Sequence, residues 1–368
     1  MTAKGDSLEE EGISFTAPEE VFYNPSMRFC RSISSLAVGA VQKEVDVVDA
    51  FCASGIRGIR YAKENSNVDS ITFLDLEASA IKAAEKNSRS NGLGAEFKQG
   101  NISRLAFECA TDFLEIDPFG TPSPYLVDGF RFFNPKKTAY LSVTATDVAV
   151  LCGAKTAPCL KNYHSKPLNN GFTHETGLRI LIKRIAEVAA EFNMGIEPLV
   201  SFSDRHYLKT IMKATRGADL AFQSMKSLGH LHYCSKCGFR GHGRFPEPAC
   251  RNCGHENDYA GPLWLGELHQ KQFIESMGRL NQERQYSDKS EISGFLSLLE
   301  NETGFPPYYY NVHQLSRFLG KGRIPKLGTI VERLDSKGYR TVRTHFSSTS
   351  IKTPAPYSEI LEALEWKS

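Results

Sequence analysis

The sequence predicts an α/β fold: an open, Rossmann-like sheet of seven strands, followed by a cysteine-rich insertion and a C-terminal α+β unit. Three observations support this fold class. Strand patterns alternate with helical patterns from residue 45 to residue 192, as expected of parallel strands joined by helices. Two more strand patterns, at 196–202 and 206–214, are separated by a few polar residues, so a hairpin should close the sheet. The cysteine-rich segment 230–258 and the unit 267–368 then follow.

Length and composition limit the possible classes of protein. A chain of 368 residues is long enough for two or three domains, and we divide it into residues 1–266 and 267–368. The net charge of +2 gives no overall attraction for polyanions, so any nucleic-acid surface must be local. No stretch approaches the ~20 apolar residues of a membrane span, and the N-terminus lacks an apolar signal core. We therefore expect a cytoplasmic protein with no membrane contact and no obligate protein partner.

The first strand pattern, at 45–50, runs into a turn that carries Gly55 and Gly58 and then into a helix. Small residues at such a turn let a ligand approach the backbone, and the helix N-terminus offers free N–H groups. The next strand pattern, at 70–75, ends at Asp75, 20 residues after Gly55, which suits an acid that binds ribose hydroxyls. The turn lacks G-x-G-x-x-G, and a second acid, Asp49, precedes it. The site therefore suits a nucleoside with an amino-acid tail, as in S-adenosylmethionine, better than a pyrophosphate.

A second strand end, Leu114-Glu115-Ile116-Asp117-Pro118-Phe119-Gly120, carries groups suited to chemistry on a base. An acid at the carboxyl end of a strand lies where open α/β sheets bind their ligands. Pro118 and Gly120 hold the following backbone in a tight turn, and Phe119 has no obvious core to enter. We therefore expect Asp117, the backbone carbonyls and the Phe119 ring to hold a flat base while its exocyclic amine reacts.

The remaining elements fit the same sheet. The sequence predicts helices at 27–41, 77–89 and 175–192, and strands at 95–99, 113–116 and 138–143. Leu181, Ile185 and Val188 share one face of the longest helix, as a core-facing helix requires. The strands at 95–99 and 138–143 lead to Asn101 and Asp147, respectively.

Four of the nine cysteines form two pairs, Cys234-x2-Cys237 and Cys250-x2-Cys253, with 12 residues between the pairs. Each pair is followed by glycine, as in knuckles whose thiolates converge on a tetrahedral metal ion. Four cysteines leave no open coordination position, so we expect structural zinc. The other five cysteines are scattered, which suits a reducing cytoplasm better than a disulfide framework.

Two segments are locally basic. Residues 204–251 contain nine Lys/Arg and three Asp/Glu, and residues 321–352 contain eight and two. Each excess alone fits a solvated face, but two in a nearly neutral chain favour a polyanionic partner. In the second segment we expect Arg340 and Arg343 to contact that partner. Helical patterns at 313–319 and 327–337, followed by a strand at 339–343, are similar to a winged-helix arrangement.

Together these motifs resemble those of the tRNA (guanine-26) N2-dimethyltransferase family. The matching segments are Val21-Phe22-Tyr23-Asn24-Pro25, Gly55-Ile56-Arg57-Gly58-Ile59-Arg60, Asp117-Pro118-Phe119-Gly120, Val143-Thr144-Ala145-Thr146-Asp147, His174-Glu175, Gly261-Pro262-Leu263-Trp264-Leu265-Gly266 and Arg343-Thr344-His345-Phe346-Ser347. The resemblance implies a class I methyltransferase domain that transfers two methyl groups from S-adenosylmethionine to the exocyclic N2 of a tRNA guanine. Because one pocket cannot select a single guanine of a folded tRNA, we expect the unit 267–368, with its basic stretch, to bind the tRNA. The compact length resembles archaeal members of the family.

The resemblance also implies roles for individual residues. Asp117 corresponds to the catalytic acid. Cofactor contacts correspond to Arg31, Asp49, Gly55, Arg57, Asp75 and Asn101, and guanine contacts to Phe22, Phe119 and Asp147. The sequence departs from the family pattern at two places. Cys30-Arg31-Ser32 stands where the family has Asn-Arg-Asp, and Asn101 stands where an acid would contact adenine.

Two alternative functions remain compatible with the residues. One is another nucleic-acid amino-methyltransferase, which acts on rRNA guanine N2 or on adenine N6. The other is a non-catalytic RNA-binding protein with the same fold. The methylated nucleoside distinguishes the first alternative, and failure to bind S-adenosylmethionine would support the second.

Overall fold

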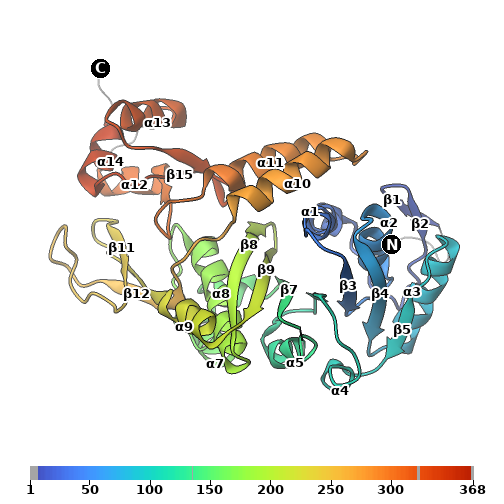
Figure 1. Cartoon of the computed structure of the whole chain (residues 1–368). Helices are drawn as coiled ribbons and strands as arrows, with labels where there is room; N and C mark the ends of the chain where they lie inside the picture. The colour runs from blue at the N-terminus through green and yellow to red at the C-terminus, as the bar shows by residue number, and fades with distance from the viewer. Residues whose placement is uncertain (1–6, 135, 321–323, 366–368) are drawn as a thin grey trace.

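The computed structural model describes residues 7–134, 136–320 and 324–365. Its centre is a sheet of seven strands in the order β5-β4-β3-β6-β7-β9-β8 (Figure 1), which confirms the predicted fold class. The strands are β3 (Val45–Ala50), β4 (Val68–Asp75), β5 (Glu96–Gln99), β6 (Phe113–Ile116), β7 (Thr138–Ala145), β8 (Met194–Asp204) and β9 (Tyr207–Arg216). Strands β3 to β7 are parallel. The late hairpin β8–β9 joins them through an antiparallel pairing of β9 with β7.

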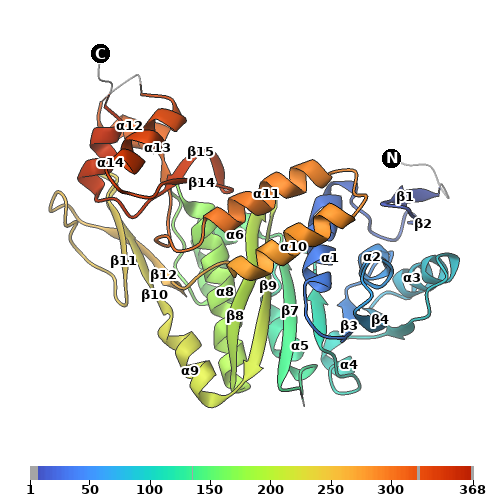
Figure 2. The same cartoon turned by 45° about the horizontal axis from the view of Figure 1, so that its top comes forward.

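Helices cover both faces of the sheet and create two apolar cores (Figure 2). One core joins the sheet to α5 (Leu126–Arg131), α7 (Thr156–Tyr163) and the long helix α8 (Thr173–Glu191). The other joins it to α1 (Arg28–Gly39), α2 (Ile56–Glu64) and α3 (Ala78–Ser90). Strand β6 is buried along its whole length. Leu114 and Ile116 belong to the first core and Phe113 to the second, as the alternation of side chains along a strand requires.

Several short elements were not predicted, because three or four residues are too few to show a periodic pattern. They are the hairpin of β1 (Leu8–Glu10) and β2 (Ile13–Phe15), helices α4 (Ile102–Leu105) and α6 (Val148–Leu151), and the 3-10 helices Pro25–Met27 and Ser123–Tyr125. The β1–β2 hairpin buries Glu10, which pairs with Arg31 and Arg60. The polar N-terminal segment is therefore part of the layer that covers the sheet.

The cysteine pairs belong to a small antiparallel sheet in the order β11-β10-β12, which follows α9 (Ala218–Lys226). Its strands are β10 (Leu228–Tyr233), β11 (Arg240–Gly243) and β12 (Asp258–Trp264). We call residues 228–264 the ribbon. The chain ends in helices α12 (Val312–Phe318), α13 (Leu327–Ser336) and α14 (Tyr357–Ala363) and strands β13 (Tyr310–Asn311), β14 (Val342–Thr344) and β15 (Ser347–Lys352). Two helices followed by the β14–β15 hairpin fit the expected winged-helix arrangement, and they enclose a third apolar core.

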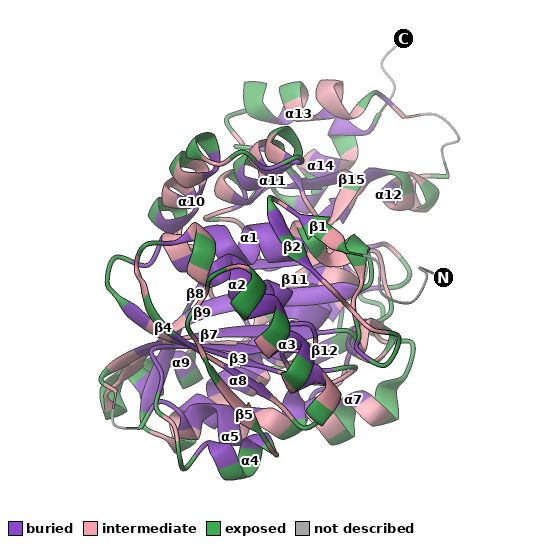
Figure 3. Cartoon of the chain, turned by 90° about the vertical axis from the view of Figure 1, so that its right-hand side faces the viewer, coloured by how far each residue is buried: buried purple, intermediate pink, exposed green. Residues whose placement is uncertain are grey.

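Helices α10 (Lys271–Glu283) and α11 (Lys289–Asn301) connect these parts. Their side chains Phe273, Ile274, Met277 and Leu299 pack in the same core as α1. Figure 3 shows α10 and α11 above α1, with buried residues in all three helices. The division of the chain at residue 266 stays a prediction. The apolar packing divides the chain later, because α10 and α11 share a core with α1 and the third core begins only after α11. Among the described residues, no helix is both long enough and apolar enough to cross a membrane.

Candidate active site

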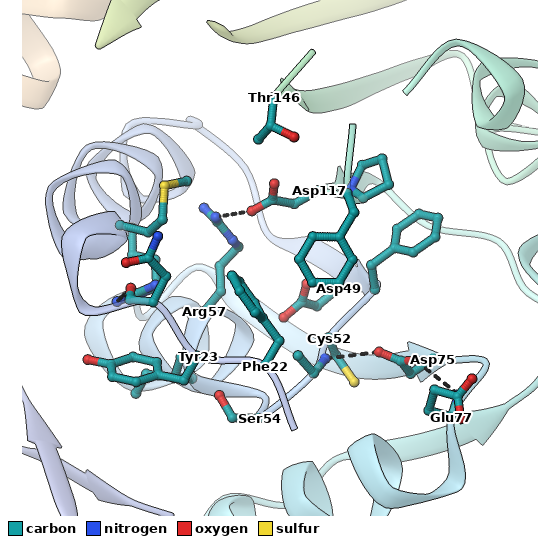
Figure 4. A pocket seen from close by; sticks show the side chains of 18 residues that line it. Phe22, Tyr23, Asp49, Cys52, Ser54, Arg57, Asp75, Glu77, Asp117 and Thr146 are labelled. Atoms are coloured by element: carbon teal, nitrogen blue, oxygen red, sulfur yellow. Dashed lines mark hydrogen bonds and ion pairs between the residues drawn. The ribbon is translucent and has the colours of Figure 1, made fainter. Parts of the chain in front are cut away.

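A pocket with a volume of about 400 Å³ opens at the carboxyl ends of β3, β4 and β6 (Figure 4). This is the edge where open α/β sheets bind ligands. The lining includes these residues that the sequence singled out: Phe22, Arg31, Asp49, Arg57, Asp75, Asp117 and Phe119. Segments that are nearly 100 positions apart in the chain thus meet around one cavity.

Asp117 extends from the end of β6 into the pocket and forms an ion pair with Arg57, between Oδ2 and Nη2. The turn that follows is fixed by two hydrogen bonds to Thr146. Gly120 N donates to Thr146 Oγ1 at 2.7 Å, and Thr146 N donates to Gly120 O at 3.0 Å. Gly120 has φ = 78°, which glycine adopts without steric cost. Asp117 is therefore held on a rigid loop and oriented by a buried cation.

Arg57 lies on the first turn of α2 and is buried below Asp117. Its Nη1 is 3.4 Å from Ser34 Oγ and 3.8 Å from Cys30 Sγ. Burial acts to lower the pKa of Arg57, but the carboxylates of Asp117 and Glu115 hold that pKa well above its ordinary value. Arg57 therefore gives the pocket a permanent positive charge.

Asp49, near the end of β3, behaves differently. Its Oδ2 accepts a hydrogen bond from Gly58 N at 3.0 Å, and its side chain lines the pocket. Burial raises the pKa of Asp49 to about 7, although the nearby Arg57 limits the rise. A cation that enters the pocket would therefore meet an acid whose charge changes near neutral pH.

The loop between Phe51 and Gly55 has an unusual backbone beside Asp75. Phe51, Ala53 and Gly55 have φ values of 69°, 46° and 77°, a conformation that costs roughly 1–3 kcal/mol for each non-glycine residue. Ala53 N donates to Asp75 Oδ2 at 3.0 Å, which helps to hold the loop. A Cβ on Gly55 would lie 2.9 Å from Ala84 Cβ. Gly55 therefore acts by permitting the turn, and among the described residues it is not part of the pocket lining.

Phe22 and Phe119 stand at the pocket, 53% and 76% exposed. Their rings meet edge to face, with centroids 4.7 Å apart and planes at 85°. This is a favourable geometry for an aromatic pair, and it leaves no gap for a base between the rings. A flat base can stack on the exposed face of either ring.

The remaining predicted residues have partners inside the protein. Arg31 lines the pocket, but its Nε donates to Glu10 Oε1 at 2.8 Å. Asn101 caps α4 by accepting a backbone N–H at 2.8 Å, and Asp147 accepts a hydrogen bond from Tyr163 OH at 2.8 Å. Within the described part of the chain, neither Asn101 nor Asp147 lines the pocket. Their roles in binding stay predictions.

The pocket also includes residues for which the sequence predicted no role in the site, among them Ser54, Glu77 and Thr146. Each lies within two positions of a predicted residue, so the signal was the strand end and not the residue itself. Glu77 matters most chemically, because it adds a second carboxylate beyond the end of β4, next to Asp75.

The four cysteines of the ribbon converge as their spacing predicted. Their Sγ atoms all lie within 4.8 Å of one another, with Cys234–Cys253 and Cys237–Cys250 separations of 3.6 Å. Zinc–sulfur bonds of about 2.3 Å place tetrahedral ligands about 3.8 Å apart, so the geometry fits a metal ion. Gly238 and Gly254, which follow the pairs, have φ of 80° and 72°, as the knuckle turns require.

His269, Glu302 and His345 form a second group with metal-ligand chemistry, but its hydrogen bonds favour a different use. Ser203 N donates to His345 Nε2 at 3.3 Å, so the ring proton lies on Nδ1, which is 2.8 Å from Glu302 Oε1. Ser201 N donates to His269 Nδ1 at 3.4 Å, which places that proton on Nε2. Each histidine therefore uses one ring lone pair for a backbone N–H of β8. The His345–Glu302 hydrogen bond links β8 to the end of α11 and the β14–β15 turn, while His269 Nε2 has no hydrogen-bond partner among the described residues.

The strand order and a pocket lined by strand-end acids define a class I methyltransferase, whose cofactor site lies at this edge of the sheet. The chain belongs to the N2,N2-dimethylguanosine tRNA methyltransferase family, because the sequence model of that family matches residues 4–365.

Similar proteins cover nearly the whole chain. A relative from Methanothermobacter thermautotrophicus, named tRNA (guanine(26)-N(2))-dimethyltransferase, is 34% identical over 361 residues, which cover 96% of this chain and 94% of the relative. A relative of the same name from Archaeoglobus fulgidus is 34% identical and covers 96% and 97%. The solved structure of Trm1 from Pyrococcus horikoshii with S-adenosyl-L-methionine has a TM-score of 0.89 at 28% identity, covering 98% of this chain and 100% of that one.

Proposed function

We propose that this protein transfers two methyl groups from S-adenosylmethionine to the exocyclic N2 of guanine 26 in tRNA. The names of its relatives support this activity. The observation in this chain that supports it most directly is Asp117, which Arg57 orients beside the exposed rings of Phe22 and Phe119. An acid, a fixed cation and stacking surfaces in one cavity suit an aromatic amine.

The pocket fits the proposed cofactor. Asp75 and Glu77 line the pocket beyond the end of β4, so we expect them to bind the ribose hydroxyls, and we expect the Asp49 carboxylate to face the charged amino-acid end. The bound cofactor supplies a methyl group on a positively charged sulfur. Because the pKa of Asp49 is about 7, a neighbouring positive charge favours its ionised form, so cofactor binding near neutral pH should release a proton.

Asp117 works by orienting the amine. The lone pair of guanine N2 is delocalised into the ring, so the planar amine is a poor nucleophile. The ion pair with Arg57 uses Oδ2, which leaves Oδ1 to accept an N–H and favour a pyramidal nitrogen. Positioning of this kind is worth roughly 7–11 kcal/mol in well-oriented reactions, and proton acceptance adds about 10²–10⁴-fold.

A guanine inside folded tRNA must leave its stack to reach Asp117, at a cost of a few kcal/mol. Stacking on Phe22 or Phe119, worth about 1–3 kcal/mol per base, offsets much of this cost. Because the two rings contact each other at 4.7 Å between centroids, the base either stacks on an outer face or separates them.

The test is mass spectrometry of nucleosides from an unmodified tRNA transcript incubated with enzyme and cofactor. The wild-type protein should produce N2,N2-dimethylguanosine at position 26, and Asp117→Ala should lower the rate more than 100-fold. Asp112→Ala is the matched control, because Asp112 adjoins the other end of β6, where it pairs with Lys43 and Lys136. Modification of a different base, or turnover by Asp117→Ala within about tenfold of wild type, would contradict the proposal.

We also propose that the four ribbon cysteines hold one structural zinc ion per chain. Their separations fit a closed tetrahedral site, and such a site needs reduced thiols, so the cytoplasm is the compartment we propose. Elemental analysis should find one zinc per chain, and removal of the zinc should lower the melting temperature. Finding no metal in freshly purified protein would overturn this assignment.

A further inference from the structure

One segment next to the pocket is cationic, although neither of the two locally basic segments, 204–251 and 321–352, includes it. Between Asp147 and Glu175 the chain has no acidic residue, while it contains three lysines and two histidines. The whole chain contains 42 Asp/Glu, yet this segment contains none. Its positive electrostatic potential is therefore not cancelled by acidic residues nearby in the sequence.

The segment lies at the ligand edge of the sheet. It begins directly after β7, at whose carboxyl end Thr146 lines the pocket. Helices α6 and α7 follow, and Tyr163 at the end of α7 donates its hydroxyl hydrogen bond back to Asp147. In Figure 3, α7 lies at the lower right of the molecule with exposed residues along it. The start and the end of this helical pair are thus both tied to the pocket edge.

The C-terminal end of α7 is fixed, while Lys155, directly before the helix, and Lys161, within it, are exposed. Lys183 Nζ donates to Tyr163 O at 3.0 Å and to His164 O at 3.1 Å. Cys159 and Tyr163 are buried, whereas Lys155 and Lys161 are exposed. The third lysine of the segment, Lys166, differs because its Nζ pairs with Asp258 Oδ1 at 2.5 Å. Two cations are therefore presented by a rigid support, as a preformed binding surface requires.

The tip of the β8–β9 hairpin adds cations at the same edge. In the strand register Leu208 faces Ala145, the last residue of β7, and Tyr207 faces Asp204. Arg205 and His206 therefore project just beyond the end of β7, and both are exposed. Arg205 has φ = 46°, as the first residue of a two-residue hairpin turn commonly does.

We propose that Lys155, Lys161, Arg205 and His206 form a cationic rim that binds the RNA backbone on either side of the target guanine. This inference rests on the proposed function. Segment 148–174 and the hairpin tip both follow the carboxyl end of β7, and at this border of the pocket Thr146 lines the cavity together with the exposed rings of Phe22 and Phe119. A base that enters the pocket brings its own phosphate and the adjacent phosphates to this border. Contacts to phosphate fix position and carry no sequence information, so the rim holds the strand while the pocket selects the base.

The experiment measures binding of an unmodified tRNA transcript to the full chain, without cofactor, over a salt series. The variant is Lys155→Ala/Lys161→Ala/Arg205→Ala. Each lost phosphate contact should reduce the log–log salt slope by roughly 0.7–0.9, so the slope should fall by about 2–3 and affinity at low salt should drop more than tenfold. The control Lys82→Ala/Lys86→Ala/Arg89→Ala removes the same charge from the exposed face of α3 and should bind like wild type.

Melting temperature and cofactor affinity show whether the fold and the pocket of each variant are intact. The proposal of a cationic rim is wrong if the rim variant keeps the wild-type melting temperature and the wild-type salt slope. It is also wrong if the α3 control loses as much tRNA affinity as the rim variant. Failure of the proposed function gives a different result. In that case wild-type protein binds tRNA with a steep, rim-dependent slope but does not methylate guanine 26. If wild type methylates tRNA and the rim variant binds normally, only the rim is wrong.

Discussion

The basic segment 321–352 and the acid-free segment 148–174 differ in how many of their cations bind the protein itself. In 321–352 the described cations largely bind the protein itself. Lys352 Nζ lies 2.6 Å from Glu175 Oε1, and Arg340 donates to Asn301 O at 2.9 Å and Thr303 O at 3.2 Å. Arg333 and Lys337 bind carbonyls or carboxylates near α14. Lys326, just before α13, and Arg343 on β14 are exposed, and Lys321 and Arg323 lie outside the described residues.

In 148–174 the net charge is smaller, yet Lys155 and Lys161 are exposed beside the pocket edge. A count of charges along the chain therefore does not give the number of cations that are free to bind RNA. Some cations that contribute to the charge of a sequence segment are not available to RNA, because they form buried ion pairs or bind carbonyl groups at the ends of helices. The comparison reduces the expected RNA contacts of the C-terminal segment to a few exposed residues.

The largest effect is expected for Lys352→Met. Lys352 is 2% exposed, and removing one partner of a buried ion pair typically costs 3–5 kcal/mol. We expect about 3 kcal/mol in urea denaturation, at the lower end, because Arg179 still neutralises Glu175 at 2.9 Å. Lys337→Ala is the control, since its exposed pairs should leave the unfolding midpoint unchanged. If Lys352→Met lowered the free energy of unfolding by less than about 1 kcal/mol, the ion pair of Lys352 would not be important for stability.

A smaller effect is expected for Arg340→Ala. Its guanidinium binds two carbonyl groups at the end of α11 and lies 4.6 Å from the centroid of Phe305. Losing these contacts should cost about 1 kcal/mol and should leave the salt slope of tRNA binding unchanged. If the salt slope of tRNA binding became flatter while the free energy of unfolding stayed constant, Arg340 would contact RNA, as the sequence predicted.

The smallest expected effect is that of Arg343→Ala, which should not change stability. If this exposed arginine contacts one phosphate, the log–log salt slope should fall by roughly 0.7–0.9. Arg205→Ala, measured in the same series, provides the direct comparison between the two segments. If Arg343→Ala changed the salt slope more than the three-residue rim variant does, segment 321–352 would contribute more to RNA binding than the rim.

Strong local patterns made the sheet and much of the pocket predictable. Each of β3, β4 and β6 carries its own apolar pattern, and an acid near each carboxyl end, Asp49, Asp75 or Asp117, follows from that pattern. Phe119 was correctly expected to be exposed, because its turn offers no core. The spacing of the cysteines sufficed to bring their four sulfur atoms together.

Long-range partners explain what was not predicted. Glu10 lies in a polar segment, yet it is buried against Arg31 and Arg60, 21 and 50 positions away, and no local pattern indicates this. A strand end fixes the edge that a residue occupies and not the direction of its side chain. Asp147 therefore binds Tyr163, while its neighbour Thr146 lines the pocket.

The packing of α10 and α11 has a consequence for exchange of parts between members of the family. A cut at residue 266 would strip Phe273, Met277 and Leu299 from the core that they share with α1. The ribbon, in contrast, adheres to the third core: Phe239 stacks edge to face on Tyr357 at 5.6 Å, and Tyr357 OH donates to Cys237 O. A graft that moves residues 228–264 and 304–365 together and leaves α10 and α11 with the recipient keeps both of these interfaces, but it removes Leu231, Ala260 and Leu263 from the first core.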